Sequence, residues 1–404
     1  MWEQIRINKR NSIFLLISMG LVMSALGFAI GAAFGGPEGG VFGSAIAGGI
    51  WVFLGIISFS QGDSILLASS RAVPVTHDVH PQLFNIVEEM KIAASLPKIP
   101  NIYIINDPSP NAFATGRNPE RASVAVTAGL LTKLNRDELQ GVIAHEISHI
   151  VHRDILFVTL AGVMLGSIVL LSNMFMRGMF YSSMGSRRYS SRSRNNGGQA
   201  IFLIIAILLA ILAPIFAYLL YFALSRRREY LADAGAVRLT RYPEGLASAL
   251  EKIAGAGQSV QTANKVTAPM YIANPFRGKK ATDLYSTHPP IEERIRILRN
   301  INHGAALVDY EKSYEAVTRR AGMIPPSGLK EEAVPLREPS APPPPPSGRG
   351  QHKEMGDLMR KVNGFYFINC DCGATLKIPP NFPSEKLQCP RCGRIHELWS
   401  SIYV

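Results

Sequence analysis

Cysteine is scarce in this chain, and its scarcity excludes a fold held together by disulfides. The 404 residues include only 4 cysteines, and all of them lie between residues 370 and 392. A disulfide framework distributes its cysteines over the whole fold. The two close pairs found here therefore indicate one local metal site.

Charge is also scarce, at 18% of the residues, and long stretches contain none. The uncharged stretches comprise residues 13–34, 41–59, 155–176 and 200–224. About 20 apolar residues in a helix cross the hydrocarbon core of a bilayer, and the core helices of soluble proteins rarely stay uncharged for so long. The sequence therefore predicts four transmembrane helices in two hairpins, the first closed by a short turn at residues 35–40.

The net charge of +12 is compatible with nucleic acid or with anionic lipid as a partner. Several arginines lie close to the apolar stretches, which favours the lipid bilayer, and no nucleic-acid partner is expected. Arg6, Lys9 and Arg10 precede the first stretch. The positive-inside rule then predicts a cytoplasmic N-terminus and cytoplasmic segments on both sides of the second hairpin.

The loop of the second hairpin, residues 177–199, does not fit this topology. It is basic, yet the topology puts it outside. Its arginines are Arg177, Arg187, Arg188, Arg192 and Arg194. Two explanations stay open: the first helix overrides the charge rule, or the second apolar pair does not fully span the membrane.

The strongest chemical motif is the pentapeptide at residues 145–149, His-Glu-Ile-Ser-His. Asn135 and Glu138 predict the capped start of a helix that includes it. On a helix, His145 and His149 lie one turn apart on one face and can bind the same zinc ion. Glu146 would lie beside them, within reach of a water molecule.

Catalytic zinc sites usually have three protein ligands. One known pattern for the third ligand needs glycine and histidine where this chain has His152 and Ile155, so that pattern is excluded. The other is a glutamate on a second helix with an acidic residue one turn further on. Glu229 and Asp233 fit it: Glu229 would bind zinc, and Asp233 would accept the free N–H of a ligand histidine, which we expect to be His145. His152 is a further candidate ligand, but two histidines and a glutamate already complete the set.

With these residues in place, the chain resembles the M48 family of membrane metallopeptidases from its N-terminus to about residue 302. The motifs that carry the resemblance are residues 111–116, 145–149, 229–233 and 286–294. The resemblance implies a gluzincin-like zinc endopeptidase in the bacterial inner membrane, with its catalytic domain on the cytoplasmic side. It also implies polypeptide substrates, chiefly misfolded or damaged membrane proteins, and a role in quality control and stress. The oligomeric state stays open.

The resemblance also suggests roles for residues outside the zinc motifs. An edge strand would line the substrate cleft and bind peptides by strand addition, although an ordinary hairpin is an equal alternative there. This strand comprises Asn111, Ala112, Phe113, Ala114 and Thr115. His288 and Arg294 match a motif associated with stabilising the transition state. Pro289 and Pro290 suit the first turn of a helix over residues 291–300, with His288 at its cap.

We therefore expect Glu146 to act as general base, accepting a proton from the attacking water and passing it to the leaving amine. One rival hypothesis is a CAAX-type prenyl-protein protease, which shares the zinc motifs but has more transmembrane helices. The other is a membrane-anchored zinc-binding scaffold without catalytic activity. Intact His145, Glu146, His149 and Glu229 argue against the scaffold.

The tail ends in a candidate zinc ribbon. Its CxC and CxxC pairs are preceded and followed by short strand-like segments, which is typical of a structural zinc site, while a redox pair is the alternative. The four ligands would be Cys370, Cys372, Cys389 and Cys392, and His396 could replace one of them. The expected cofactors are thus one catalytic and one structural zinc ion.

The predicted fold class is α+β and mainly helical, with short strands at residues 101–105 and 122–127. The hairpins and the soluble segments alternate along the chain. The predicted units are a first transmembrane hairpin at 1–60, the first part of the catalytic domain at 61–154, a second hairpin at 155–225, the second part of the catalytic domain at 226–322, a proline-rich linker at 323–352 and the zinc ribbon at 353–404.

Overall fold

The structure is a computed structural model of the whole chain. It describes residues 2–185, 197–263, 267–276, 288–330, 332–340, 348–384 and 386–398. Most of the basic loop lies outside the described residues, as do Ser286 and Thr287 of the last motif and residues 341–347 of the predicted linker.

The first membrane element is helix α1 (Trp2–Ser69), which consists of two arms. Its helical geometry is interrupted at Gly35 and Gly36, where Gly36 has a φ of 64°. The arms pack closely: a Cβ atom on Gly31 would lie 2.1 Å from the carbonyl oxygen of Gly39. Only glycine permits this approach, and the interruption at Gly35 and Gly36 falls inside the turn expected at residues 35–40.

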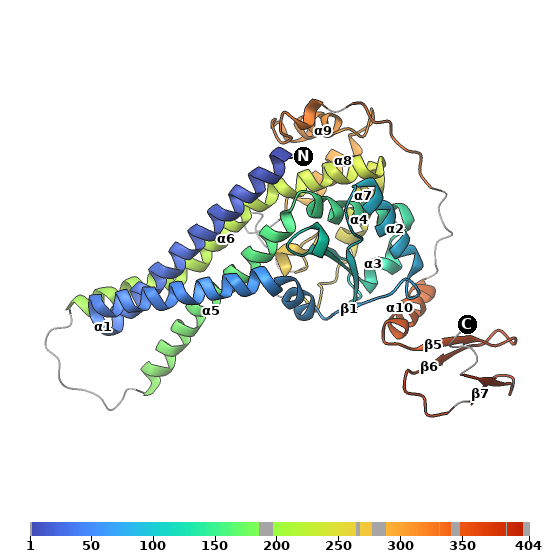
Figure 1. Cartoon of the computed structure of the whole chain (residues 1–404), viewed down its shortest axis with the longest axis horizontal. Coiled ribbons are helices and arrows are strands. Elements are labelled where there is room, and N and C mark those ends of the chain that lie inside the picture. Colours follow the sequence, from blue (N-terminus) through green and yellow to red (C-terminus); the bar gives the residue numbers. More distant parts are fainter. Residues whose placement is uncertain are drawn as a thin grey trace.

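Helices α5 (Asp154–Gly185) and α6 (Gly197–Thr240) pack along α1 and extend with it to one side of the body, the part of the molecule that contains the four-stranded sheet (Figure 1). Within the described residues, 2 helical stretches are long and apolar enough to cross a membrane, Ile5–Ser69 and Ala200–Leu219. The first of these contains both arms of α1. The apolar part of α5 is shorter, Met164–Met179. Four membrane-spanning helices therefore stay a prediction.

The body is built on a four-stranded sheet of order β1-β2-β4-β3. Its strands are β1 (Ala72–Pro74), β2 (Asn101–Ile105), β3 (Ala112–Thr115) and β4 (Ser123–Thr127). Strands β2 and β4 are parallel, whereas β3 pairs antiparallel with β4 and forms one edge of the sheet. The two strands predicted from the sequence correspond to β2 and β4.

Helix α4 lies at the centre of the body, where it contacts α2, α6, α7 and β3. The helices of the body are α2 (Pro81–Ala93), α3 (Ala128–Lys133), α4 (Arg136–Val151), α7 (Pro243–Gly255), α8 (Ile291–Arg299) and α9 (Leu307–Thr318). The side chain of Asn135 accepts from the Glu138 backbone N–H, and Glu138 caps Asn135 in return. The predicted capping box is thus confirmed. Helix α8 begins after Pro290, so His288 precedes its cap instead of forming it.

The tail contains helix α10 (Gly348–Val362) and two small sheets. The strands are β5 (Tyr366–Asn369), β6 (Thr375–Ile378), β7 (Lys386–Gln388) and β8 (Ile395–Glu397). Helix α10 packs on α3, and its Leu358 and Met359 join the hydrophobic core of the body. The tail is therefore attached to the body by packing as well as by the chain.

Residues 334–340, which we call the strap, belong to the predicted linker, but they are bonded to the body. Arg337 Nη2 donates to Asp137 Oδ1 on α4 at 2.9 Å, and Ser340 Oγ donates to the same oxygen at 2.8 Å. Arg337 N and Nε donate to the carbonyl oxygens of Arg241 and Thr240, where α6 ends. The strap thus connects the start of α4 with the end of α6.

Candidate functional site

Helices α4 and α6 bring the two halves of the zinc motif together, although 80 residues separate His149 from Glu229 in sequence. His145 Nε2 and His149 Nε2 lie 3.2 Å apart. Glu229 Oε2 lies 3.7 Å from the first nitrogen, and Oε1 lies 3.6 Å from the second. His152 caps the end of α4 and is not part of this cluster.

These three donors fit a single zinc ion. Zinc bonds of about 2.0–2.1 Å in a tetrahedral arrangement put neighbouring ligand atoms about 3.3 Å apart. The two imidazole nitrogens are 3.2 Å apart, close to that value, and with one atom taken from each of the three residues all ligand atoms lie within 4.8 Å of one another. Two imidazoles and one carboxylate also leave a fourth tetrahedral position for a further ligand.

The two imidazoles are oriented by carboxylates on their far side. His145 Nδ1 lies 2.9 Å from Asp233 Oδ1, and His149 Nδ1 lies 3.2 Å from Asp154 Oδ2. Each contact turns Nε2 toward the cluster, as is usual for metal-binding histidines. Burial lowers the pKa of His145 to about 4, so its Nε2 lone pair is available at neutral pH.

His149 and Glu229 attract each other. Burial lowers the pKa of His149, but Asp154 and Glu229 outweigh that effect and raise it to about 9. Burial alone would raise the pKa of Glu229, yet His288, His149 and Arg294 hold it well below its usual range. Glu229 is therefore ionised, and a cation competes with a proton for His149.

Arg294 and His288 both contact carboxylates of the cluster. Arg294 is 1% exposed, and its Nε and Nη2 donate to both oxygens of Asp233 at 2.8 and 2.7 Å. Its Nη1 donates to the carbonyl oxygen of Ile272 at 2.9 Å. His288 Nδ1 lies 3.0 Å from Glu229 Oε2. The guanidinium thus faces Asp233, which in turn holds His145.

Glu146 lies on the same helix with its carboxyl group fully buried. Its Oε1 has no hydrogen-bond partner among the described residues. Burial raises the pKa of Glu146 to about 8, while nearby His149 and a hydrogen bond from the Ala114 backbone act against that rise. A carboxyl group with a pKa near neutrality can both accept and donate a proton.

The predicted substrate strand corresponds to β3 at the edge of the sheet. Its side chains are buried: Asn111 Nδ2 donates to the carbonyl oxygen of Ala273, and the Phe113 ring packs 5.1 Å from that of Tyr271. The carbonyl oxygen of Ala112 accepts from Ile272 N. The backbone of Ala114 hydrogen-bonds to Glu146, and because the side chains of the strand are buried, only its main-chain groups remain suitable for a peptide.

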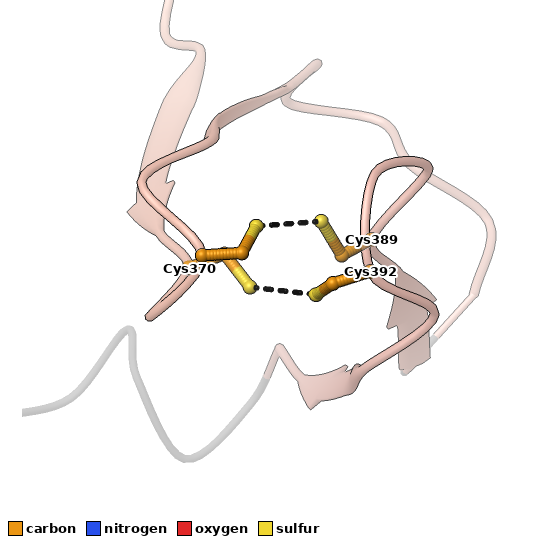
Figure 2. A group of neighbouring side chains, drawn as sticks. Cys370, Cys389 and Cys392 are labelled. Atoms are coloured by element: carbon orange, nitrogen blue, oxygen red, sulfur yellow. Dashed lines mark hydrogen bonds between the residues drawn. The ribbon is translucent and has the colours of Figure 1, made fainter.

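The four cysteines of the tail form a second candidate metal centre. Cys370 Sγ and Cys392 Sγ lie 3.4 Å apart, and Cys372 Sγ and Cys389 Sγ lie 3.7 Å apart. Figure 2 shows the sulfur atoms facing one another between two loops, and no disulfide joins them. Zinc–sulfur bonds of about 2.3 Å would put tetrahedral sulfur atoms about 3.8 Å apart, so these thiols fit one zinc ion.

The two loops explain why a glycine follows each cysteine pair. Gly373 and Gly393 have φ angles of 81° and 77°, which side chains rarely adopt. Their N–H groups donate to the carbonyl oxygens of Cys370 and Cys389. Backbone N–H groups of Arg391 and Cys392 lower the pKa of the Cys389 thiol, which favours its thiolate, the form that binds metal.

Two contributors to the site are missed by reasoning from the sequence. Ile272 contacts both β3 and Arg294 through its backbone, which no motif can indicate. Asn8 of α1 donates to the carbonyl oxygen of His152 and to Asp154. The available signal was a polar residue at the start of an apolar stretch, but it does not identify a partner 146 positions away.

A sequence model of the protein family described as "Peptidase family M48" matches residues 77–302 of this chain. A "Protease HtpX homolog" from Dictyoglomus turgidum is 46% identical over 310 residues, which cover 77% of this chain and 98% of the relative. Another, from Ligilactobacillus salivarius, is 42% identical over 302 residues, 74% of this chain and 100% of the relative. Among solved structures, Ste24p from S. mikatae is similar at 19% identity with a TM-score of 0.39, covering 74% of this chain and 67% of that one.

Proposed function

The chain belongs to peptidase family M48, and from that membership we propose that His145, His149 and Glu229 hold the zinc ion with which it hydrolyses peptide bonds. The protein is a zinc metalloendopeptidase of the membrane. One observation carries the residue assignment: two imidazole nitrogens and a carboxylate from separate helices converge within 3.7 Å, with Glu146 beside them.

Zinc bound at this site supplies Lewis-acid polarisation of a carbonyl group and a lowered pKa for water. Glu146 accepts the proton of the attacking water and then donates it to the leaving amine. Its uncommitted Oε1 and its raised pKa support this role. Burial of the carboxyl group on α4 keeps bulk solvent from competing for the proton.

Arg294 is a positioning residue in this proposal. Burial would raise the pKa of Asp233, but Arg294 and His145 outweigh burial and hold this pKa below its usual value. Asp233 therefore stays ionised and keeps the N–H of His145 on Nδ1. His288 contacts the ligand Glu229 and lies at the site itself, where it can stabilise charge that develops on a substrate oxygen.

The substrates are polypeptides, and we assign misfolded or damaged membrane proteins to this enzyme as a quality-control protease. The relatives named HtpX support a proteolytic role. A peptide would add to the edge of β3 near Ala114, where main-chain hydrogen bonds bind with little sequence selectivity. The four cysteines of the tail would hold a second, structural zinc ion.

Removing the metal tests the proposed chemistry. Full-length protein in detergent should cleave unfolded casein, and 1,10-phenanthroline should reduce the cleavage to background. Added Zn²⁺ should restore it, whereas Mg²⁺ should not, because a site of two imidazoles and one carboxylate suits zinc better than a hard oxygen-seeking cation. Cleavage that persists after the chelator has removed all metal would contradict the assignment.

We place the protein in the inner membrane with four spans and with the catalytic body and tail in the cytoplasm. Arg6, Lys9 and Arg10 before the first arm of α1 support this orientation. A soluble protease should remove the tail in inverted inner-membrane vesicles and leave it intact in spheroplasts. The reverse pattern of accessibility would overturn the orientation without affecting the zinc chemistry.

A further inference from the structure

A membrane arm of α1 reaches the metal centre through Asn8. This side chain is 4% exposed. Its Nδ2 donates to the carbonyl oxygen of His152, which caps the end of α4, at 3.0 Å. The same nitrogen donates to Oδ1 of Asp154, the first residue of α5. One amide therefore connects the first arm with the junction of two other helices.

Asp154 links Asn8 to the metal cluster. It is 1% exposed, and its two oxygens have different partners. Oδ1 accepts from Asn8, while Oδ2 lies 3.2 Å from Nδ1 of His149. Because the imidazole is rigid, the direction of its Nε2 follows from where Asp154 holds Nδ1. The position of one candidate zinc ligand thus depends on a carboxylate that α1 holds.

The turn between α4 and α5 has an unfavourable backbone conformation and therefore requires stabilising contacts. Arg153, between His152 and Asp154, has a φ of 57°, a backbone conformation that side chains rarely adopt. Such a conformation persists where surrounding contacts determine it. Asn8 bonds to the residue on each side of Arg153, so it fixes this turn at both ends.

We propose that Asn8 is a positioning residue for the catalytic metal and acts through Asp154 on His149. The proposal rests on the proposed zinc site and extends it into the membrane part of the molecule. A buried carboxylate that loses a donor must rotate or find water. Either change moves Asp154, the partner of His149, and lowers the affinity of the site for zinc.

The first test compares Asn8→Ala with Ser12→Ala in the full-length protein. Ser12 is buried one turn along the same arm, and its hydroxyl donates to the carbonyl oxygen of Asn8, not to the metal site. Zinc affinity would be measured by competition with a chelator, and the tail zinc would serve as an internal reference. We expect Asn8→Ala to weaken the catalytic zinc about tenfold, since partners of metal ligands have effects of about 10–100-fold. Ser12→Ala should change it less than about twofold.

A double-mutant cycle tests the route. In an Asp154→Ala background, Asn8→Ala should change zinc affinity less than about twofold, because the carboxylate that it acts through is gone. Equal losses in both backgrounds would show that Asn8 does not act through Asp154. Asn8→Asp keeps the size of the side chain but faces Asp154 with a second carboxylate, so it should weaken zinc more than Asn8→Ala.

The outcomes separate this proposal from the proposed function. If wild-type protein binds no zinc outside the tail, the zinc site itself is wrong. If wild-type protein binds it and cleaves casein while both Asn8 variants keep the wild-type affinity, only the role of Asn8 is wrong. Asn8→Asp provides the comparison if Asn8→Ala does not fold.

Discussion

Glu146→Gln is expected to abolish peptide cleavage while leaving the metal content unchanged. The amide has nearly the same shape as the carboxyl group, so α4 and the imidazoles of His145 and His149 keep their positions. It cannot accept a proton, however, and proton transfer by a positioned group contributes about 10²–10⁴-fold to the rate. The measurement is kcat on casein for both proteins, with zinc quantified in the same samples.

The matched control for this variant is Glu120→Gln. Glu120 is an exposed glutamate in the short 3₁₀ turn Pro119–Arg121, between β3 and β4. It should cleave at the rate of the wild type. Wild-type rates for Glu146→Gln would contradict the role of general base, and simultaneous loss of zinc would indicate that Glu146 also supports the metal.

Glu229→Ala should remove the catalytic zinc and all activity with it. This change deletes one of three donors and leaves His145 and His149 without the charge that attracts a cation. Because changes to mere partners of ligands already cost about 10–100-fold in affinity, we expect a loss of more than about 100-fold. Metal analysis of dialysed protein should then find one zinc ion per chain where the wild type has two.

Cys389→Ser is the complementary control. It should remove the tail zinc and keep the catalytic zinc, because the two clusters share no residue. Casein cleavage should survive this change, whereas Glu229→Ala should lose it. If both variants lost the same zinc, or if the wild type contained only one, the assignment of two separate sites would be wrong.

The sequence allowed prediction of whatever depends on local spacing. A turn of helix determines where His149 lies relative to His145, and the capping box of Asn135 and Glu138 determines where that helix starts. The CxC and CxxC pairs likewise indicate from short motifs that the four cysteines come together. These features require no knowledge of distant contacts, so reasoning from residues alone is sufficient.

Contacts between distant elements were harder to predict. The expected substrate strand occupies a sheet edge, but the burial of Asn111 depends on Ala273, far along the chain. Arg294 was expected to act on the transition state, and this role stays a prediction; what the sequence did not indicate is that its guanidinium pairs with Asp233 and lies 3.5 Å from Glu229. Tertiary packing determines which way a long side chain turns, and one sequence without its fold does not include that information.

Helix α10 could have been found by its pattern. Met355, Leu358, Met359 and Val362 have the spacing of one apolar helix face, and they pack on the core of the body. The proline-rich stretch before this helix predicted a linker up to residue 352 instead. A short amphipathic helix beside low-complexity sequence is easily missed when composition is weighed before periodicity.

The strap gives the molecule a mechanical property. A partner that pulled on the ribbon would exert force first on the contact between α10 and α3. The force would then act on the hydrogen bonds of Arg337 and Ser340, which precede α10 in the chain. Those bonds end on Asp137 of α4 and on the end of α6, the helices that carry the proposed zinc donors. Tension on the tail would therefore act at the start of α4 and at the end of α6, because the bonds of the strap end there.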